Sequence, residues 1–363
     1  MKPTTAFAAV LLFLASLTGV SAQESLNLSA QIKTKATLYS KIATPSSITI
    51  GSAAGLSLLL EGARERASFR ARARLSLLQG KEAANLWLAL GLPRSGDFLL
   101  TAPAFDLTST APSALLAFAL EELALRSHAG PLSFEAGLSH ANWGLGKAFS
   151  PADYFTDIDY SSGTPSRRST LLAKASWYPG PVSSLELVIT PYSRIGKALA
   201  LHGYTTIFEA VTFAASAGLR EAAGSSTGLL IGGAELSIDL PYTSPYGEAV
   251  ACLDPDKGWK LEYSIMGGAE TRLGDVSLMG EYLFAPHQSA VHSIYVAAAW
   301  KIDEWFSLAL PLYYIPSPET LNFSTAISAS GLGSMEYQAS LSWEKNTAGD
   351  WFAGFNLQAG LSL

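Results

Sequence analysis

Hydrophobic and polar residues alternate along much of the chain, which predicts β-strands rather than helices. From Leu26 to Leu38 the even positions carry Leu, Ala, Ile and Thr, whereas the odd positions carry Asn, Ser, Gln, Lys and Thr. The same period of two returns in 259–265, 335–343 and 351–363. Consecutive strand residues point to opposite faces, so each of these segments has one apolar and one polar face.

Turn-forming residues separate these segments at short intervals. The clearest are Gly80-Lys81, Pro179-Gly180-Pro181, Asp254–Gly258, Gly274-Asp275, Pro316-Ser317-Pro318 and Gly331-Leu332-Gly333. Segments of about 9–11 residues match the length of a strand that crosses a bilayer at a tilt. Strands in lipid cannot leave an open edge, so such a sheet must close on itself. We therefore predict an all-β fold, a transmembrane antiparallel β-barrel of about 16 strands, within a range of about 14 to 18.

Composition supports a sheet in contact with lipid. Charged residues make up 15% of the 363-residue chain, whereas roughly 25% is usual for soluble domains. Mean hydropathy is +0.23, yet the charge-free stretches 42–60 and 282–300 contain Pro, Gly or His and do not fit membrane-spanning helices. Six of the 8 Trp residues lie near predicted strand ends, where transmembrane barrels carry aromatic girdles. A soluble exported β-protein would alternate in the same way and is the alternative fold.

Residues 1–22 have the features of a secretory signal peptide. Lys2 supplies a positive charge, 6–17 form a short apolar stretch, and 20–22 provide small residues for cleavage. We therefore expect a signal peptide, 1–22, followed by a barrel, 23–363, that is exported to the outer membrane of a diderm bacterium. A single Cys excludes an intrachain disulfide, and a net charge of −6 argues against a nucleic-acid partner.

A run of arginines is the first candidate for pore chemistry. Arg64, Arg66, Arg70, Arg72 and Arg74 fall on one face of a predicted strand. An arginine in lipid costs about 2–4 kcal/mol at the bilayer midplane, so this face is expected to line the lumen. One interpretation is an anion-attracting wall in a water-filled pore. The other is pairing with lumenal acids, for which the candidates are Glu135, Glu186, Glu262 and Glu336.

A long segment without alternation follows the predicted strand 132–141. It runs from Trp143 through Phe149 and Asp153 to Arg167 and Arg168. Loops of this length without structure of their own are usually functional or disordered. One interpretation is a constriction loop folded into the barrel and anchored by Trp143 and Phe149. The other is a loop on the surface.

Three short motifs in this region resemble a known family. They are Trp143-Gly144-Leu145-Gly146, Ser150-Pro151-Ala152-Asp153 and Tyr178-Pro179-Gly180. Their order is similar to that of porin-like outer-membrane β-barrels of diderm bacteria, although Ser150 stands where Asn is usual. The C-terminal segment also resembles the closing strand of such barrels, with Leu363 in place of the terminal aromatic residue. The resemblance implies periplasmic chaperones and the barrel-assembly machinery as partners, and it implies no particular solute.

The sequence contains no recognisable catalytic or metal-binding motif. The five His residues, which are His128, His140, His202, His287 and His292, stand in no nucleophile or metal motif, and there is no phosphate-binding loop or Cys pair. We therefore expect no enzyme activity, no metal and no cofactor. The function predicted is passive diffusion of small hydrophilic solutes through a porin-like channel in outer-membrane lipid. A structural or adhesive barrel without an open pore is the alternative.

Overall fold

The computed structural model describes residues 26–42, 48–64, 66–80, 82–84, 98–105, 112–153, 155, 158–159, 166–167, 169–192, 197–221, 228–255, 258–316, 319–332 and 334–362. The predicted signal peptide, 1–22, lies outside the described residues, and so do Arg168 and Leu363. Within the described ranges, no helix is long and apolar enough to cross a membrane.

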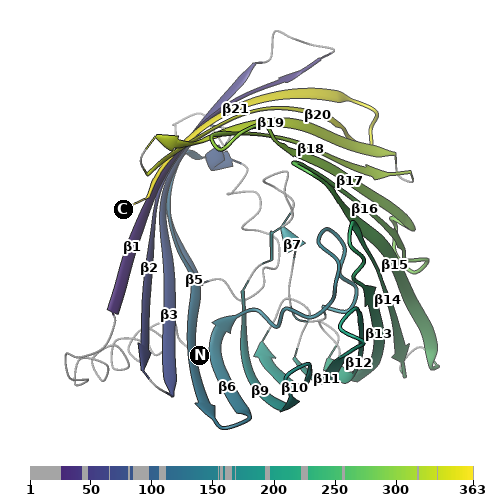
Figure 1. The fold of residues 1–363 in the computed structure, drawn as a ribbon. Coiled ribbons are helices and arrows are strands. Elements are labelled where there is room, and N and C mark those ends of the chain that lie inside the picture. Colours follow the sequence, from purple (N-terminus) through teal and green to yellow (C-terminus); the bar gives the residue numbers. More distant parts are fainter. Residues whose placement is uncertain are drawn as a thin grey trace.

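Eighteen strands of the described chain form one closed antiparallel barrel (Figure 1). In barrel order they are β1 (Leu26–Lys41), β2 (Thr49–Arg64), β3 (Ala67–Gly80), β5 (Pro112–Ala129), β6 (Leu132–Ser139), β9 (Thr170–Gly180), β10 (Ser183–Tyr192), β11 (Ala198–Ile207), β12 (Val211–Glu221), β13 (Gly228–Ile238), β14 (Thr243–Asp254), β15 (Lys260–Leu273), β16 (Val276–Phe284), β17 (His292–Lys301), β18 (Phe306–Ile315), β19 (Thr320–Leu332), β20 (Met335–Lys345) and β21 (Trp351–Ser362). β1 and β21 close the barrel by pairing from Gln31 with Ser362 to Lys41 with Phe352. The predicted closed antiparallel barrel is confirmed, and its 18 strands correct the estimate of about 16.

The estimate was low because some hairpin turns carry neither Gly nor Pro. The turn 208–210 between β11 and β12 places Phe208 and Glu209 at φ angles of 54° and 60°. Left-handed backbone is uncommon for residues other than glycine, so the residue types do not reveal this turn. The arginine-rich run 64–74 likewise contains the end of β2 and the start of β3 rather than one strand.

Connections of different length mark the two ends of the barrel. At one end, which also holds the end of β21, the strands are joined by the short connections 65–66, 130–131, 181–182, 208–210, 239–242, 274–275, 302–305 and 333–334. At the other end the connections are mostly longer, and 81–111 and 140–169 are the longest. Outer-membrane barrels place short turns in the periplasm and longer loops outside. We therefore call the two ends the periplasmic end and the outer end.

Large apolar side chains cover the outside of the barrel. On β11, Leu199 and Leu201 are 42% and 44% exposed, whereas Ala200 between them is 4% exposed. The segment 26–38 has the same orientation, because Leu28 and Ile32 on its apolar face are exposed. An apolar outer face and a polar or small inner face are typical of barrels in lipid.

Six tryptophans lie close to the two ends of the strands, as predicted. Those at the periplasmic end are Trp177, Trp300 and Trp305, and those at the outer end are Trp259, Trp343 and Trp351. Indole rings favour the boundary between water and lipid, so the two sets correspond to the two aromatic girdles of a membrane barrel.

The strand β5 has 18 residues and pairs with three other strands. One edge pairs with β3 along its length, and the other pairs with β6 near the periplasmic end and with β4 (Phe98–Phe105) beyond it. The β3–β5 register shifts between Arg72 and Ala73, because Glu121 is an additional residue in β5. This β-bulge lets both Glu121 and Glu122 reach arginines on the inner face of β3.

Candidate channel lining and infolded loop

The structure separates the five candidate arginines. Arg70, Arg72 and Arg74 lie on the inner face of β3, because the alternate residues of this strand, such as Leu75, are exposed on the outside. Arg66 lies in the turn before β3. Arg64 ends β2 at the periplasmic rim, on the face that carries the exposed Leu58 and not on the inner face. The column of arginines in the barrel therefore spans 70–74 and not 64–74.

Arg70 has acidic partners on both neighbouring strands. Its Nε lies 2.9 Å from Glu61 Oε1 on β2 and 3.5 Å from Glu122 Oε2 on β5. Two carboxylates beside one guanidinium remove most of the positive field that Arg70 would otherwise present to the lumen.

Arg72 and Arg74 differ in whether a neighbouring carboxylate compensates their positive charge. Nη2 of Arg74 lies 2.8 Å from Oε1 of Glu121, the bulge residue of β5. Arg72 is the register partner of Glu122, but that carboxylate is directed to Arg70. Within the part of the chain that the structure describes, Arg72 has no ion-pair partner.

The acids predicted as partners have other contacts. Glu135 Oε2 lies 2.9 Å from Arg126 Nε and 3.5 Å from Lys174 Nζ, and Ser139 donates to Glu135. Glu186 accepts a hydrogen bond from a tryptophan of the infolded loop, described below. The alternative of internal pairing therefore applies to Arg70 and Arg74, but with acids on the adjacent strands, because strand register decides which groups meet.

Two lysines that the sequence analysis did not single out extend the charge onto β1. Lys33 and Lys35 lie on the inner face, opposite to the exposed Ile32. Across β2, Lys33 is level with Gly55, one inward-facing position beyond Arg74 toward the outer end. Lys35 Nζ lies 3.3 Å from Oε1 of Glu82, whereas Lys33 has no ion-pair partner among the described residues. The alternation of these lysines with Ile32 in the sequence could have predicted that they lie on the inner face.

The segment after β6 folds into the barrel and packs on its inner wall (Figure 1). Trp143 is 1% exposed, and its Nε1 donates to Oε2 of Glu186 on β10 at 2.9 Å. Its ring stacks on His202 of β11 and meets Phe155 edge-on, with 4.9 Å between ring centroids in both cases. Nε2 of His202 lies 3.0 Å from Glu235 Oε1 on β13, so a tryptophan of the loop covers a row of buried polar groups.

Glu248 on β14 holds both ends of a tight turn in this segment. This 2% exposed carboxylate accepts hydrogen bonds from the backbone N–H groups of Leu145, Gly146 and Ala152, the last two at 2.6 and 3.0 Å. Gly144 has a φ of 82°, and a Cβ at this position would lie 3.0 Å from Glu248 Oε1. Gly144 of the motif Trp143-Gly144-Leu145-Gly146 therefore lets the carboxylate approach the backbone.

Glu281 on β16 holds the middle of the same turn. It is 3% exposed and accepts the backbone N–H groups of Lys147, Ala148 and Phe149 at 2.6, 2.9 and 2.8 Å. The hydroxyl of Tyr246 on β14 donates to the same carboxylate at 2.6 Å. The side chains of Ala148 and Phe149 pack in a buried cluster on the inner wall.

The rest of the predicted constriction segment is described in part. Ser150 Oγ donates to the carbonyl of Trp143 at 3.3 Å, and the backbone N–H of Asp153 donates to the Ser150 carbonyl at 3.1 Å. Asp153 is 8% exposed and accepts the N–H of Phe155, so it closes the turn. Arg167 lies in β8 (Ser166–Arg167), which pairs with β7 (Ile158–Asp159) in a short hairpin.

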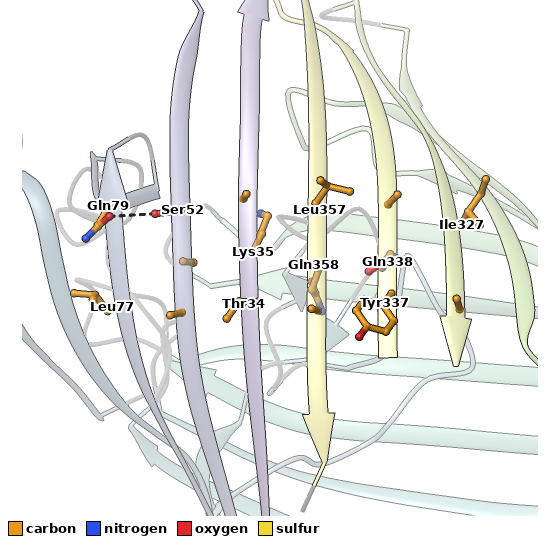
Figure 2. Close-up of a pocket in the computed structure, with 16 residues that line it drawn as sticks. Thr34, Lys35, Ser52, Leu77, Gln79, Ile327, Tyr337, Gln338, Leu357 and Gln358 are labelled. Carbon is orange, nitrogen blue, oxygen red and sulfur yellow. Dashed lines mark hydrogen bonds between the residues drawn. The ribbon is translucent and has the colours of Figure 1, made fainter. Parts of the chain in front are cut away.

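Two hollows adjoin the wall of the arginine column. One of about 270 Å³ near the periplasmic end is lined by Asn27, Glu61, Ser68, Arg70 and Arg126 among others. Figure 2 shows another, of about 660 Å³, which extends from Leu77 to Ile327 across the closure of the barrel. Leu77 and Ile327 are 44% and 49% exposed on the outer face, so this second hollow lies on the outside of the barrel. No group of three or more His, Cys, Asp or Glu among the described residues is placed to hold a metal ion.

Comparison with solved structures identifies the fold. OccAB4 of Acinetobacter baumannii matches with a TM-score of 0.61 at 8% sequence identity, over 94% of this chain and 99% of that chain. A BenF-like porin from Pseudomonas fluorescens Pf-5 matches with a TM-score of 0.60 at 8% identity, over 94% and 99%. OpdK of Pseudomonas aeruginosa, determined with vanillate, matches with a TM-score of 0.56 at 8% identity, over 93% and 98%. No protein-family model and no curated protein matches the sequence.

The chain has the fold of an outer-membrane porin. The predicted resemblance to porin-like barrels of the outer membrane is thereby confirmed at the level of the fold. Because the identities are so low, the match concerns the path of the backbone.

Proposed function

We propose that the protein is a passive outer-membrane channel for small hydrophilic solutes that prefers anions. The preference rests on unequal compensation in the lumen. Arg72 and Lys33 have no acidic partner among the described residues, whereas Arg70 has two. The net charge of −6 for the whole chain does not oppose this, because the field that an ion meets depends on the charges that line its path.

Small carboxylates are suitable solutes for a first test. OpdK, which shares the fold, was determined with vanillate, a small aromatic carboxylate. Arginine presents several N–H donors in a plane and binds carboxylates through paired hydrogen bonds. Arg72 and Lys33 are two lumenal cations on the arginine side of the barrel that have no ion-pair partner among the described residues.

Single-channel recording tests the proposal. The mature chain, 23–363, is refolded into a planar bilayer, and the unitary conductance and the reversal potential are measured in a potassium chloride gradient. We expect discrete steps and a reversal potential displaced toward that of chloride. A displacement toward that of potassium would refute the anion preference. A folded, inserted and silent barrel would refute the channel and favour the structural or adhesive alternative.

The route to the membrane is part of the same proposal. We propose cleavage after Ala22 and insertion by the barrel-assembly machinery with periplasmic chaperones. The closing strand β21 supports this, because it pairs with β1 and β20 along nearly its whole length. Mass spectrometry of the protein purified from outer membranes, with Gln23 expected as the first residue, tests the cleavage.

A further inference from the structure

We propose that Glu248 and Glu281 set the size limit of the channel, because they hold the infolded turn 144–152 against the wall. The inference rests on the proposed channel function and assigns the two carboxylates a positioning role in it. Neither residue has a role that the sequence pattern alone would predict, since neither stands in a recognisable motif.

Six backbone N–H groups end on these two carboxylates. They belong to the consecutive residues 145–149 and to Ala152. The segment 140–150 has no helix or strand, so its backbone donors have no ladder partners of their own. Hydrogen bonds to an ionised acceptor are stronger than those between neutral groups. The carboxylates therefore supply the contacts that secondary structure supplies elsewhere.

The infolded turn and the two carboxylates depend on each other for their hydrogen bonds. Glu248 and Glu281 are 2% and 3% exposed, so neither carboxylate has access to bulk water while the loop is in place. A buried carboxylate is tolerated only when hydrogen bonds replace its hydration. For Glu248 the donors come from the loop alone in the described structure, and for Glu281 they come from the loop and from Tyr246. Loss of either carboxylate thus leaves loop donors unpaired inside the barrel.

The two anchors hold different parts of the turn. Glu248 binds Leu145 and Gly146 at its start and Ala152 at its end, whereas Glu281 binds the three residues at its middle. The strands that carry them, β14 and β16, lie across the barrel from β3 in Figure 1. The held turn therefore occupies the side of the lumen opposite the arginine column, and its release would widen the passage without removing the column.

The experiment measures unitary conductance and the largest polyethylene glycol that enters the pore, in wild type, Glu248→Gln and Glu281→Gln. Glu336→Gln is the matched control, because it removes the same charge from the inner face of β20 and Glu336 contacts no described residue of the loop. Tyr246→Phe is a milder variant that removes one donor to Glu281 and keeps the carboxylate. Heat-modifiable migration on a gel shows which variants have folded barrels.

We expect both glutamine variants to admit larger polymers and to conduct more than wild type, with the Tyr246→Phe variant between them and wild type. Wild-type conductance and size limit in all three folded variants would overturn the inference. If the glutamine variants do not fold, the Tyr246→Phe variant decides in the same way. A silent wild type would overturn the proposed function instead. Hydrogen exchange at the amides of 145–149 would then decide the anchoring, which requires faster exchange in Glu281→Gln than in Glu336→Gln.

Discussion

Arg74 and Glu121 form an ion pair across the β3–β5 ladder, with 2.8 Å between Nη2 and Oε1, at the point where β5 carries an additional residue. Consecutive residues of a regular strand point to opposite faces, so a regular β5 would place only one of Glu121 and Glu122 in the lumen. The bulge brings in both, and each reaches a different arginine. A local irregularity in one strand thus decides how much of the arginine column is neutralised.

Replacement of Arg72 by Gln should weaken the anion preference more than replacement of Arg70. Arg72 has no acidic partner in the described structure, whereas Glu61 and Glu122 compensate Arg70. The reversal potential in a potassium chloride gradient measures the difference, and Arg70→Gln is the matched control because it removes the same charge from the same strand face. Equal shifts in the two variants would show that compensation by neighbouring glutamates does not matter to the ions in the pore.

Replacement of Glu121 by Gln should act in the opposite direction. The change leaves Arg74 without its carboxylate at 2.8 Å and adds one uncompensated positive charge to the lumen. We expect a reversal potential closer to that of chloride than in wild type, at unchanged barrel stability, because ion pairs that are partly exposed contribute only about 0–1 kcal/mol. Glu262→Gln, which removes a lumenal acid on β15, serves as the control. A shift of Glu121→Gln toward potassium would contradict the assignment.

Replacement of Trp143 by Ala should destabilise the folded barrel. The side chain is 1% exposed and fills the space between His202 and Phe155, and large-to-small changes at such sites cost about 3–5 kcal/mol of the free energy of unfolding. Trp143→Phe keeps a six-membered aromatic ring but loses the five-membered ring of the indole together with its N–H donor to Glu186. Its cost should be smaller, about 1–3 kcal/mol. Denaturant titration of the refolded barrel measures both, and equal stability of Trp143→Ala and wild type would mean that the loop does not pack as described.

Replacement of Gly146 by Ala should loosen the infolded turn and raise the size limit in the same direction as Glu248→Gln. A Cβ at this position would overlap the carbonyl oxygen of Phe149 and come within 2.8 Å of the Met266 side chain. Gly280→Ala is the control, because a Cβ there meets no atom within 4 Å. The measurement is the largest polyethylene glycol that enters the pore of each variant. A normal size limit in Gly146→Ala would show that the turn tolerates a side chain against Met266.

The architecture of the barrel could be predicted because a period of two is a local property of the chain. Each run of alternating residues predicts which side chains lie on the outer face and which face the lumen. In 26–38, for example, Leu28 on the apolar face is exposed on the outside. Low charge and tryptophans near strand ends then identify lipid as the surroundings. The strand count was less accurate, because a turn such as 208–210 uses left-handed backbone at Phe208 and Glu209 without Gly.

The residue types of the candidate site could be predicted from the sequence, but the contacts between these residues could not. The sequence by itself determined that arginines 70, 72 and 74 share one face and that a long irregular segment follows β6. Only the tertiary structure decided which arginines are compensated, because strand register and the bulge at Glu121 select the neighbouring acid. It also decided that the loop folds inward, because the carboxylates that hold it, Glu248 and Glu281, lie 96 to 134 residues further along the chain. Hydrogen bonds over such separations depend on closure of the barrel, which no local pattern of residues contains.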